Sequence, residues 1–472
     1  MTSANNKDEC LPLRELQGKK LIGYTIGTIG YIIPIALVTA FAYQFYVYTV
    51  GLDSLLTSIG IFIGLTIAAF GATIFGVISD NKKPGKLGKR RPFILCGMIL
   101  LVTTNFLCWI PPLCPQGQPY YIPTTIYFWI VFALLNVANS MIISPYTAMI
   151  PEQCQTEENR VKVAAIIGIF NILGTVLGVL FPMILQSNLE DPTAAKWWEP
   201  SGAYLVSLLP WVGGLLGLFG GIIILISFLS VDESFHLQNP KTIQEKKSIV
   251  ETFKQMFEPS KNPKFRNYLF QTSISSIGGR ILIVILVPFL TYVIQLVDIQ
   301  FIIFILILVP FAFIGFVFWN KQIPKMGLIK TNVMSNYIIT GTLLAIFIFL
   351  ISMDFSLRVI IGGILISLAL FCFVGAFLYP NPIISALVDE KAVELNSGNR
   401  LESTSKLSGS YFGLNLLLLN FFGAVANIIL GAIFTGGNEE NPILIVITFP
   451  IAAFLFLATN FFLRKIKLEK SE

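Results

Sequence analysis

Twelve long apolar runs follow one another along this chain of 472 residues, and they constrain its fold more than any other feature. Each run is long enough to cross a hydrocarbon layer about 30 Å thick as a helix. The runs lie at about 21–48, 55–79, 92–110, 124–150, 163–186, 205–230, 268–294, 300–320, 331–353, 358–387, 408–434 and 442–463. Hydrophobic residues make up 55% of the chain and charged residues only 12%, whereas soluble domains carry roughly 25% charged residues. The sequence therefore predicts an all-α polytopic membrane protein with twelve transmembrane helices.

The basic residues between the runs predict the orientation in the membrane. With both termini placed inside, the inner segments hold 29 of the 32 Lys and Arg residues. The remaining three are Lys196, Arg280 and Arg358. Short loops rich in Lys and Arg stay on the cytoplasmic side of a membrane. We therefore expect a multi-pass protein of the cell membrane with both termini in the cytoplasm.

The longest hydrophilic segment divides the runs into two sets of six. We expect a cytoplasmic tail at 1–20, a six-helix bundle at 21–230, a cytoplasmic linker at 231–266, a second bundle at 267–463 and a tail at 464–472. Inside the linker, apolar residues recur at steps of three and four over residues 249–257, a spacing that predicts an amphipathic helix lying on the inner membrane surface.

Several function classes are disfavoured by composition. The net charge of +6 comes from loops that flank the membrane rather than from one stripe, so we expect no nucleic-acid partner. The six cysteines show no paired spacing, and the single histidine, His236, lies in the linker. We therefore expect no metal site, no cofactor and no enzymatic activity, and we expect the protein to act as a monomer.

Four motifs spread over nearly the whole chain carry a family resemblance. They are Gly76-x-x-x-Asp80 with GKRRPF at 88–93, Pro145-Tyr146-x-Ala148-x-Ile150-Pro151-Glu152 with Arg160, Asn262-Pro263-x-Phe265-Arg266, and Asp389-Glu390 with GNRLE at 398–402. Together they resemble the glycoside–pentoside–hexuronide symporter group of the major facilitator superfamily, which includes melibiose permease and sucrose transporters. The resemblance implies two six-helix bundles that move a sugar or glycoside by alternating access. It also implies inner-loop ion pairs and helix caps that hold one access state closed, and the candidate residues are Gly76, Asp80, Arg90, Arg91, Glu152, Arg160, Arg400 and Glu402.

The sequence departs from this group where carboxylates would be needed. In the melibiose-permease pattern, two aspartates of the second span hold the coupling cation, and Ala68 and Ala72 stand at those positions. The aspartates that contact sugar align with Ile32 and Ile143. The sequence therefore does not distinguish coupling to sodium, coupling to protons and transport without an ion. Secondary active transport and facilitative transport both remain as alternatives.

Arg280 is the one charge that we place deep inside a run, 268–294. A charged side chain there costs roughly 2.5–3.5 kcal/mol on insertion scales, so it is expected to face a cavity. It would bind a carboxylate, a phosphate or a hydroxyl of the solute through its fork of donors. Two alternatives stand beside this reading: Gly278-Gly279 breaks the helix and leaves Arg280 near its edge, or Arg280 bonds backbone carbonyls in a structural role.

Neutral polar residues supply further candidates for solute binding: Tyr24, Thr28 and Tyr31 on the first span, Asn136 and Asn139 on the fourth, and Asn171 on the fifth. Aromatic faces pack on the C–H surfaces of sugars, and amides bond hydroxyl groups. The alternative is hydrogen bonding between helices, and it is the better explanation for any one residue taken alone. As a set, they fit a cavity lining equally well.

We therefore expect a transporter of a small polar solute, a sugar or a glycoside, in contact with the bilayer. The alternatives are a transporter of an anionic solute or a lysolipid that uses Arg280, and a non-transporting membrane sensor or scaffold.

Overall fold

The computed structural model describes residues 14–83, 85–231, 233, 248–394 and 400–467, and these residues form helices and connecting loops without a β-strand. The first six long helices are α1 (Gly18–Gln44), α2 (Ser54–Asn81), α3 (Arg91–Leu107), α4 (Ile122–Gln153), α5 (Glu157–Gln186) and α6 (Pro200–Ser230). The second set is α9 (Pro263–Pro288), α10 (Gln300–Met326), α11 (Leu328–Ala345), α12 (Phe355–Phe373), α15 (Arg400–Phe434) and α16 (Pro442–Leu463). The expected all-α fold with twelve spans is confirmed.

Ten helical segments of the described chain are long and apolar enough to cross a membrane, and α3 is a shorter apolar helix. With α5, which packs against α1, they account for the twelve runs. The sequence predicts the tenth run as one span, but it is not a single helix. It continues from α12 into the short α13 (Gly375–Leu378) and then α14 (Pro380–Glu394). The break before α14 lies at Pro380, which lacks the amide that would continue the hydrogen-bonding ladder.

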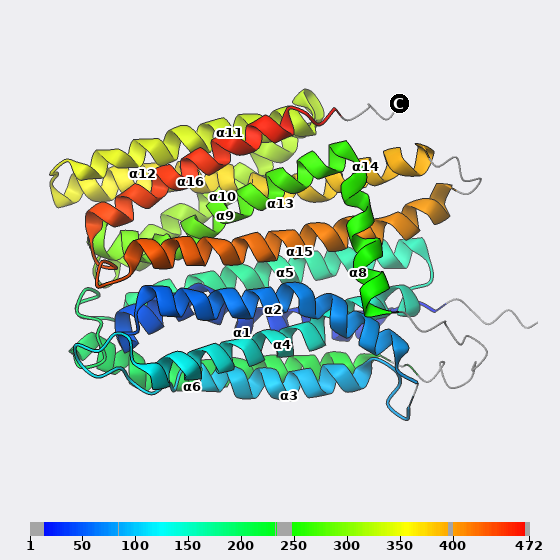
Figure 1. Ribbon diagram of the computed structural model, residues 1–472, viewed down its shortest axis with the longest axis horizontal. Coiled ribbons are helices and arrows are strands. Elements are labelled where there is room, and N and C mark those ends of the chain that lie inside the picture. Colours follow the sequence, from blue (N-terminus) through cyan, green and yellow to red (C-terminus); the bar gives the residue numbers. More distant parts are fainter. Residues whose placement is uncertain (1–13, 84, 232, 234–247, 395–399, 468–472) are drawn as a thin grey trace, which may run out of the picture.

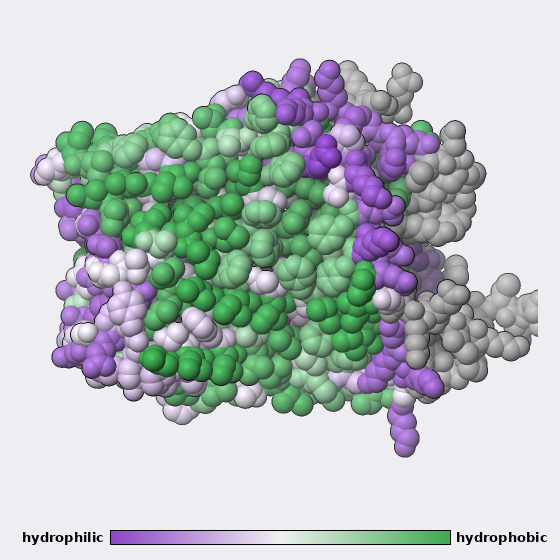
Figure 2. All heavy atoms as spheres, in the orientation of Figure 1, coloured by the Kyte–Doolittle hydropathy of each residue, from purple (hydrophilic) through white to green (hydrophobic). Residues whose placement is uncertain are grey.

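The long helices form two bundles that lie side by side (Figure 1). In the first bundle α2 packs on α4 and α1 packs on α5 and α6, and in the second α16 packs on α9 and α11. Three pairs of helices join the bundles: α2 with α15, α5 with α10, and α1 with α9. Figure 2 shows a broad hydrophobic band along the length of these helices with hydrophilic residues at both ends, as a membrane-spanning protein requires.

Close backbone approach holds the first bundle together. A Cβ atom added to Gly220 of α6 would lie 2.2 Å from the carbonyl oxygen of Gly30 on α1, and one added to Gly30 would lie 2.8 Å from the carbonyl oxygen of Gly220. Small residues at such contacts let two membrane helices touch through their backbones.

The predicted amphipathic helix is present as α8 (Ile249–Phe257) and lies across the ends of the spans (Figure 1). We call this side of the molecule the linker end, and the opposite side, with the turns at 51–53, 108–121, 187–199 and 435–441, the far end. The ring of Phe253 lies 5.9 Å from that of Phe70 on α2, and Met256 contacts Gly413 on α15. The linker helix therefore touches one helix of each bundle, and its apolar side covers their junction.

The helices α1 and α9 end at the far end in the same way. Each continues into a π-helical segment of six residues, η1 (Phe45–Val50) and η3 (Phe289–Ile294), and then into a residue with left-handed backbone, Gly51 or Gln295. In both, an amide bonds the carbonyl six residues earlier: Leu52 to Tyr46 at 2.9 Å and Leu296 to Leu290 at 3.0 Å. The two bundles thus repeat each other at the start of their halves, as pseudo-symmetric bundles do.

Candidate functional site

The two repeated π-helical ends meet at the far end. The ring of Tyr48 from η1 stacks on that of Tyr292 from η3, with centroids 5.4 Å apart and planes inclined by 24°. The hydroxyl of Tyr48 donates to the backbone carbonyl of Glu439 at 2.8 Å. Equivalent residues of the two bundles therefore contact each other on the axis that relates the bundles.

Asp53 forms a second contact between the bundles at the far end. One carboxylate oxygen caps α2 by accepting from the amide of Leu55 at 2.9 Å. The other oxygen accepts from the hydroxyl of Thr435 at 2.9 Å and from the amide of Gly436 at 3.1 Å, both just beyond α15. Asp53 is 4% exposed, so these charge-assisted bonds are shielded from water. We call the contact of Asp53 with Thr435 and Gly436 the Asp53 latch.

Lys196 of the first bundle adds an ion-pair contact to the same end. Its ammonium lies 3.2 Å from the carboxylate of Glu439 and 3.7 Å from that of Glu440, and it also donates to the carbonyl of Val47 at 3.3 Å. Burial raises the pKa of the Glu440 carboxyl above its ordinary value, and the neighbouring Lys196 partly opposes that shift. The far end is thus held by contacts that break and re-form without covalent change.

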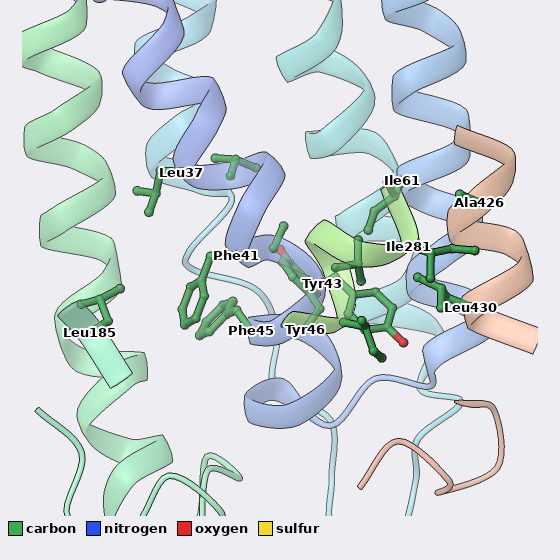
Figure 3. Packing of buried hydrophobic residues seen from close by; sticks show 14 of the residues in the cluster. Leu37, Phe41, Tyr43, Phe45, Tyr46, Ile61, Leu185, Ile281, Ala426 and Leu430 are labelled. Atoms are coloured by element: carbon green, nitrogen blue, oxygen red, sulfur yellow. The ribbon is translucent and has the colours of Figure 1, made fainter. Parts of the chain in front are cut away.

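Beneath these polar contacts, buried side chains of both bundles pack together (Figure 3). Phe41 and Phe45 of α1 and η1 face Trp109, and Tyr46 faces Phe128, inside the first bundle. Ile281 of α9 and Leu430 of α15 line the second bundle's side of the same core. They belong to one continuous core cluster. In this conformation the far end is closed by an apolar plug below a polar surface layer.

Arg280 lies on the linker side of this plug, near the middle of the span Pro263–Ile294. The helix α9 runs unbroken through Gly278-Gly279, where added Cβ atoms would meet Phe456 at 3.1 Å and Phe373 at 2.9 Å, so these glycines serve close packing rather than a break. The arginine is therefore deep in the membrane span, as the sequence had placed it.

The guanidinium of Arg280 has little to bind inside the protein. Its Nη2 donates to the carbonyl of Thr39 on α1 at 3.4 Å, a long contact that crosses between the bundles. Its Nε is buried without a hydrogen-bond partner, and no ion pair of Arg280 occurs among the described residues. A charged side chain near the middle of a membrane span costs roughly 2.5–3.5 kcal/mol on insertion scales, and this cost is not offset when no counter-charge lies beside it. This position is therefore suited to a ligand that brings the missing acceptor.

Tyr24, Thr28 and Tyr31 lie together around Tyr146 of α4. The hydroxyl of Tyr24 donates to the carbonyl of Tyr146, and the hydroxyl of Tyr146 donates to the carbonyl of Tyr24 at 2.8 Å and lies 3.1 Å from that of Thr28. The rings of Tyr24 and Tyr146 stack at 4.7 Å, and Tyr31 meets Tyr146 edge-on at 5.8 Å. Tyr24 and Thr28 are fully buried, which is the pattern expected for bonds between helices, and a solute contact for these residues stays a prediction.

The three asparagines lie in different surroundings. Asn136 donates to the carbonyl of Phe132 at 2.8 Å within α4 and lies against Gly64 of α2. Asn139 carries a buried Oδ1 without a hydrogen-bond partner. Asn171 on α5 is partly buried. Only Asn139 therefore combines burial with an unused acceptor.

Helix geometry places Asn139 between the contacts of Tyr146 and the depth of Arg280. Asn139 stands seven residues before Tyr146, which is two turns on the same face of α4 and about 10 Å toward the far end. Tyr146 is level with Tyr24 and Thr28 on α1, so the same rise along α1 ends between the Tyr146 contacts and Thr39, the partner of Arg280. Asn139 and Arg280, one on each bundle, both carry a buried polar atom without a hydrogen-bond partner.

At the linker end, the expected charged residues form contacts within the first bundle. Arg90 pairs with Asp80 of α2 at 2.7 Å and with Glu152 of α4 at 2.8 Å. Arg91 lies 4.2 Å above the ring of Phe228, and the Nε of Arg160 donates to the carbonyl of Cys154 at 2.7 Å. Gly76 lets α2 approach α4, since its added Cβ would lie 2.9 Å from the hydroxyl of Ser144. The side chains of Arg400 and Glu402 lie outside the described residues.

Sequence reasoning missed Glu233 at this end. Its fully buried carboxylate accepts from the backbone amides of Arg90 at 3.0 Å and Arg91 at 3.1 Å, and so caps α3. Tyr146 was also missed as a structural centre, although it stands in a quoted motif. The local sequence does not mark Glu233 as a helix cap, because Glu233 follows α6 and lies far along the chain from α3, the helix that it caps.

Comparisons with known proteins agree with this architecture. A family model described as MFS/sugar transport protein matches residues 23–438. The uncharacterized symporter YjmB of Bacillus subtilis (strain 168) is 25% identical over 430 residues, which are 86% of this chain and 85% of that protein. A putative 2,3-dihydroxypropane-1-sulfonate exporter of Salmonella typhimurium (strain LT2) is 24% identical over 261 residues, 54% of this chain and 50% of that protein.

Two of the curated relatives are matched over only 35% and 50% of their own length. Among solved structures, a D-xylose-proton symporter superposes with a TM-score of 0.63 at 12% identity, over 96% of this chain and 99% of that one. At such low identity the superposition shows the fold.

Proposed function

We propose that this chain, which belongs to the MFS/sugar transport protein family, carries a polyhydroxylated solute, a sugar or a glycoside, across the cell membrane. The chain is a transporter of small solutes that works by alternating access. The proposal concerns the class of solute, the site that binds it and the orientation of the protein.

The observation that carries the proposal is the pair of unsatisfied groups below the closed far end. The Oδ1 of Asn139 is an acceptor without a donor, and the Nε of Arg280 is a donor without an acceptor. Buried polar atoms in native proteins nearly always have a partner, which a bound solute or water supplies. A hydroxyl group is both donor and acceptor, so a polyhydroxylated solute long enough to span the two residues would satisfy both atoms.

The two bundles, 21–230 and 267–463, would move as bodies joined by the linker 231–266. The far end is closed by the Asp53 latch, the Lys196 ion pairs and the stack of Tyr48 on Tyr292. This closure supports the proposal that the structure represents one of the two access states. The basic residues gather at the linker end, which supports a cytoplasmic location for that end and for both termini, in a plasma-membrane protein that acts as a monomer.

Ion coupling needs another ligand than the family's usual aspartates. Within the twelve apolar runs the described residues include no Asp or Glu. Two relatives carry the name symporter, which supports a coupling ion, yet Ala68 and Ala72 offer no carboxylate for it. Transport is therefore to be measured with and without a gradient.

The experiment is uptake by purified protein in liposomes, with labelled pentoses, hexoses and glycosides, each with a sodium gradient, a proton gradient or none. We expect saturable uptake of at least one sugar that the unlabelled sugar competes. Asn139→Ala should raise the KM about tenfold through the lost hydrogen bond. Thr147→Ala, on the exposed side of the same helix, is the matched control and should leave the KM unchanged. Absence of sugar uptake together with absence of competition would refute the proposal and favour a lipid substrate or a scaffold.

A further inference from the structure

We propose that the transported solute carries an acidic group and that Arg280 binds this group. The inference rests on the proposed function and narrows it to polyhydroxylated organic anions, such as sugar acids or hydroxylated sulfonates.

The first argument is the charge of the site. Of the described residues, Arg280 is the one charged residue near the middle of a span, and no described carboxylate pairs with it. The other deep polar side chains, on α1 and α4, are neutral. A neutral solute leaves the guanidinium as an uncompensated charge in a low-dielectric region, whereas an anion neutralises it.

The second argument is the geometry of the guanidinium. Its Nε is unused, and its Nη2 makes only the 3.4 Å contact to the carbonyl of Thr39. The edge formed by Nε and a neighbouring Nη is the one that binds carboxylate and sulfonate oxygens in two parallel hydrogen bonds. An anion has to displace one weak bond to a backbone carbonyl to reach that edge.

The third argument is the position of this contact between the bundles. Arg280 belongs to α9 and Thr39 to α1, the first spans of the two bundles, and these helices pack against each other. Exchange of the Thr39 carbonyl for a solute anion would therefore change a contact across the junction that alternating access rearranges. Solute binding and the conformational change would therefore act on the same group, the guanidinium of Arg280.

The remainder of the solute is specified by Asn139. Its buried Oδ1 needs a donor, which a hydroxyl group supplies and a carboxylate does not. The solute class is therefore one with an acid at one end and hydroxyls next to it. The name of the putative 2,3-dihydroxypropane-1-sulfonate exporter describes such a compound, and this similarity supports the proposed class.

The test compares matched pairs of solutes that differ in the acidic group: galacturonate with galactose, glucuronate with glucose, and 2,3-dihydroxypropane-1-sulfonate with glycerol. Uptake into liposomes is measured for the unaltered protein, Arg280→Lys and Arg280→Gln. We expect at least one acid to enter tenfold faster than its neutral partner. Arg280→Gln should lose about a hundredfold of that uptake, and Arg280→Lys, which keeps the charge without the fork, should lose less.

A binding readout separates folding from function. Addition of the transported acid should raise the melting temperature of the purified unaltered protein and leave that of Arg280→Gln unchanged. If Arg280→Gln does not fold, the matched pairs and Arg280→Lys decide the question. Equal uptake of an acid and its neutral partner, or full acid uptake by Arg280→Gln, overturns the role of Arg280 but leaves sugar transport standing. Uptake of neither member of any pair overturns the proposed function itself.

Discussion

The Asp53 latch allows the stability of the closed far end to be changed by one atom. In Asp53→Asn the oxygen that caps α2 can remain, because asparagine is as good an N-cap as aspartate. The other oxygen, which accepts from Thr435 and Gly436, becomes an amide that donates, so two buried donors lose their acceptor. The substitution therefore weakens the contact between the bundles and spares the helix.

The size of the effect follows from these two bonds. Hydrogen bonds to a charged group contribute about 1.5–3 kcal/mol each, and part of the loss is recovered when water enters the opened end. We expect the closed far end to lose about 2–3 kcal/mol, which is roughly a 30- to 150-fold shift of the equilibrium toward opening.

The shift can be measured as a distance between spin labels on the two bundles. Gln116→Cys and Asn438→Cys place labels on exposed far-end loops, one on each bundle, in a background without other accessible cysteines. In Asp53→Asn the long-distance population should grow. Asn441→Ala removes a helix cap at the same end, on α16, that makes no described contact with the other bundle, and it should leave the distances unchanged.

A double-mutant cycle with Thr435→Val tests the partner. The two substitutions should be far from additive, because each removes the same bond. An unchanged distance distribution in Asp53→Asn, with protein that still melts cooperatively, would refute the idea that this contact sets the equilibrium.

Three further predictions address other parts of the molecule. Gly220→Val should reduce the yield of folded protein in membranes, because its side chain would overlap the backbone of α1; size-exclusion profiles report this directly. Glu233→Gln should lower the melting temperature by a few degrees through the lost charge at the cap of α3, and unchanged melting would count against that role. The pKa of Glu440 is raised above its ordinary value of 4.5 in the closed far end, so protonation of Glu440 stabilises the closed state; this contribution is fully present below about pH 4.5 and is lost as the pH rises through the raised pKa. The same labels should therefore show closure on acidification, and Glu440→Gln should abolish the effect.

The fold was accessible from sequence because membrane helices are specified locally. Each span needs about 20 apolar residues whatever its neighbours are, so the number of spans and the depth of Arg280 could be read from hydropathy. The same holds for α8, where apolar residues at helical spacing predicted the observed bounds Ile249–Phe257. The run 358–387 was predicted as one span, since hydropathy does not register the helix break that precedes Pro380.

The candidate site was accessible only in part, because it depends on which helices meet. Tyr24, Thr28 and Tyr31 were recognised as one face of a helix, but their common partner Tyr146 comes from a helix more than a hundred residues away. The Asp53 latch joins positions at opposite ends of the chain, and nothing in the local sequence of Asp53 distinguishes it from an ordinary helix cap. Pairings of this kind follow from the packing of the bundles and not from any single segment.

The depth of Arg280 has a consequence for the electrical behaviour of the protein. Arg280 lies near the middle of its span, on the linker side of the plug. In the alternating-access cycle proposed above, the barrier to the solution lies at the far end in this conformation and at the linker end in the other. When the plug opens and the opposite end closes, the same positive charge lies on the other side of the barrier, although it has hardly moved. An anion bound at Arg280 as proposed above would cancel this charge. The voltage therefore acts on the return of the empty protein, at up to about 2.3 kcal/mol per 100 mV for a full charge, and much less on the loaded one.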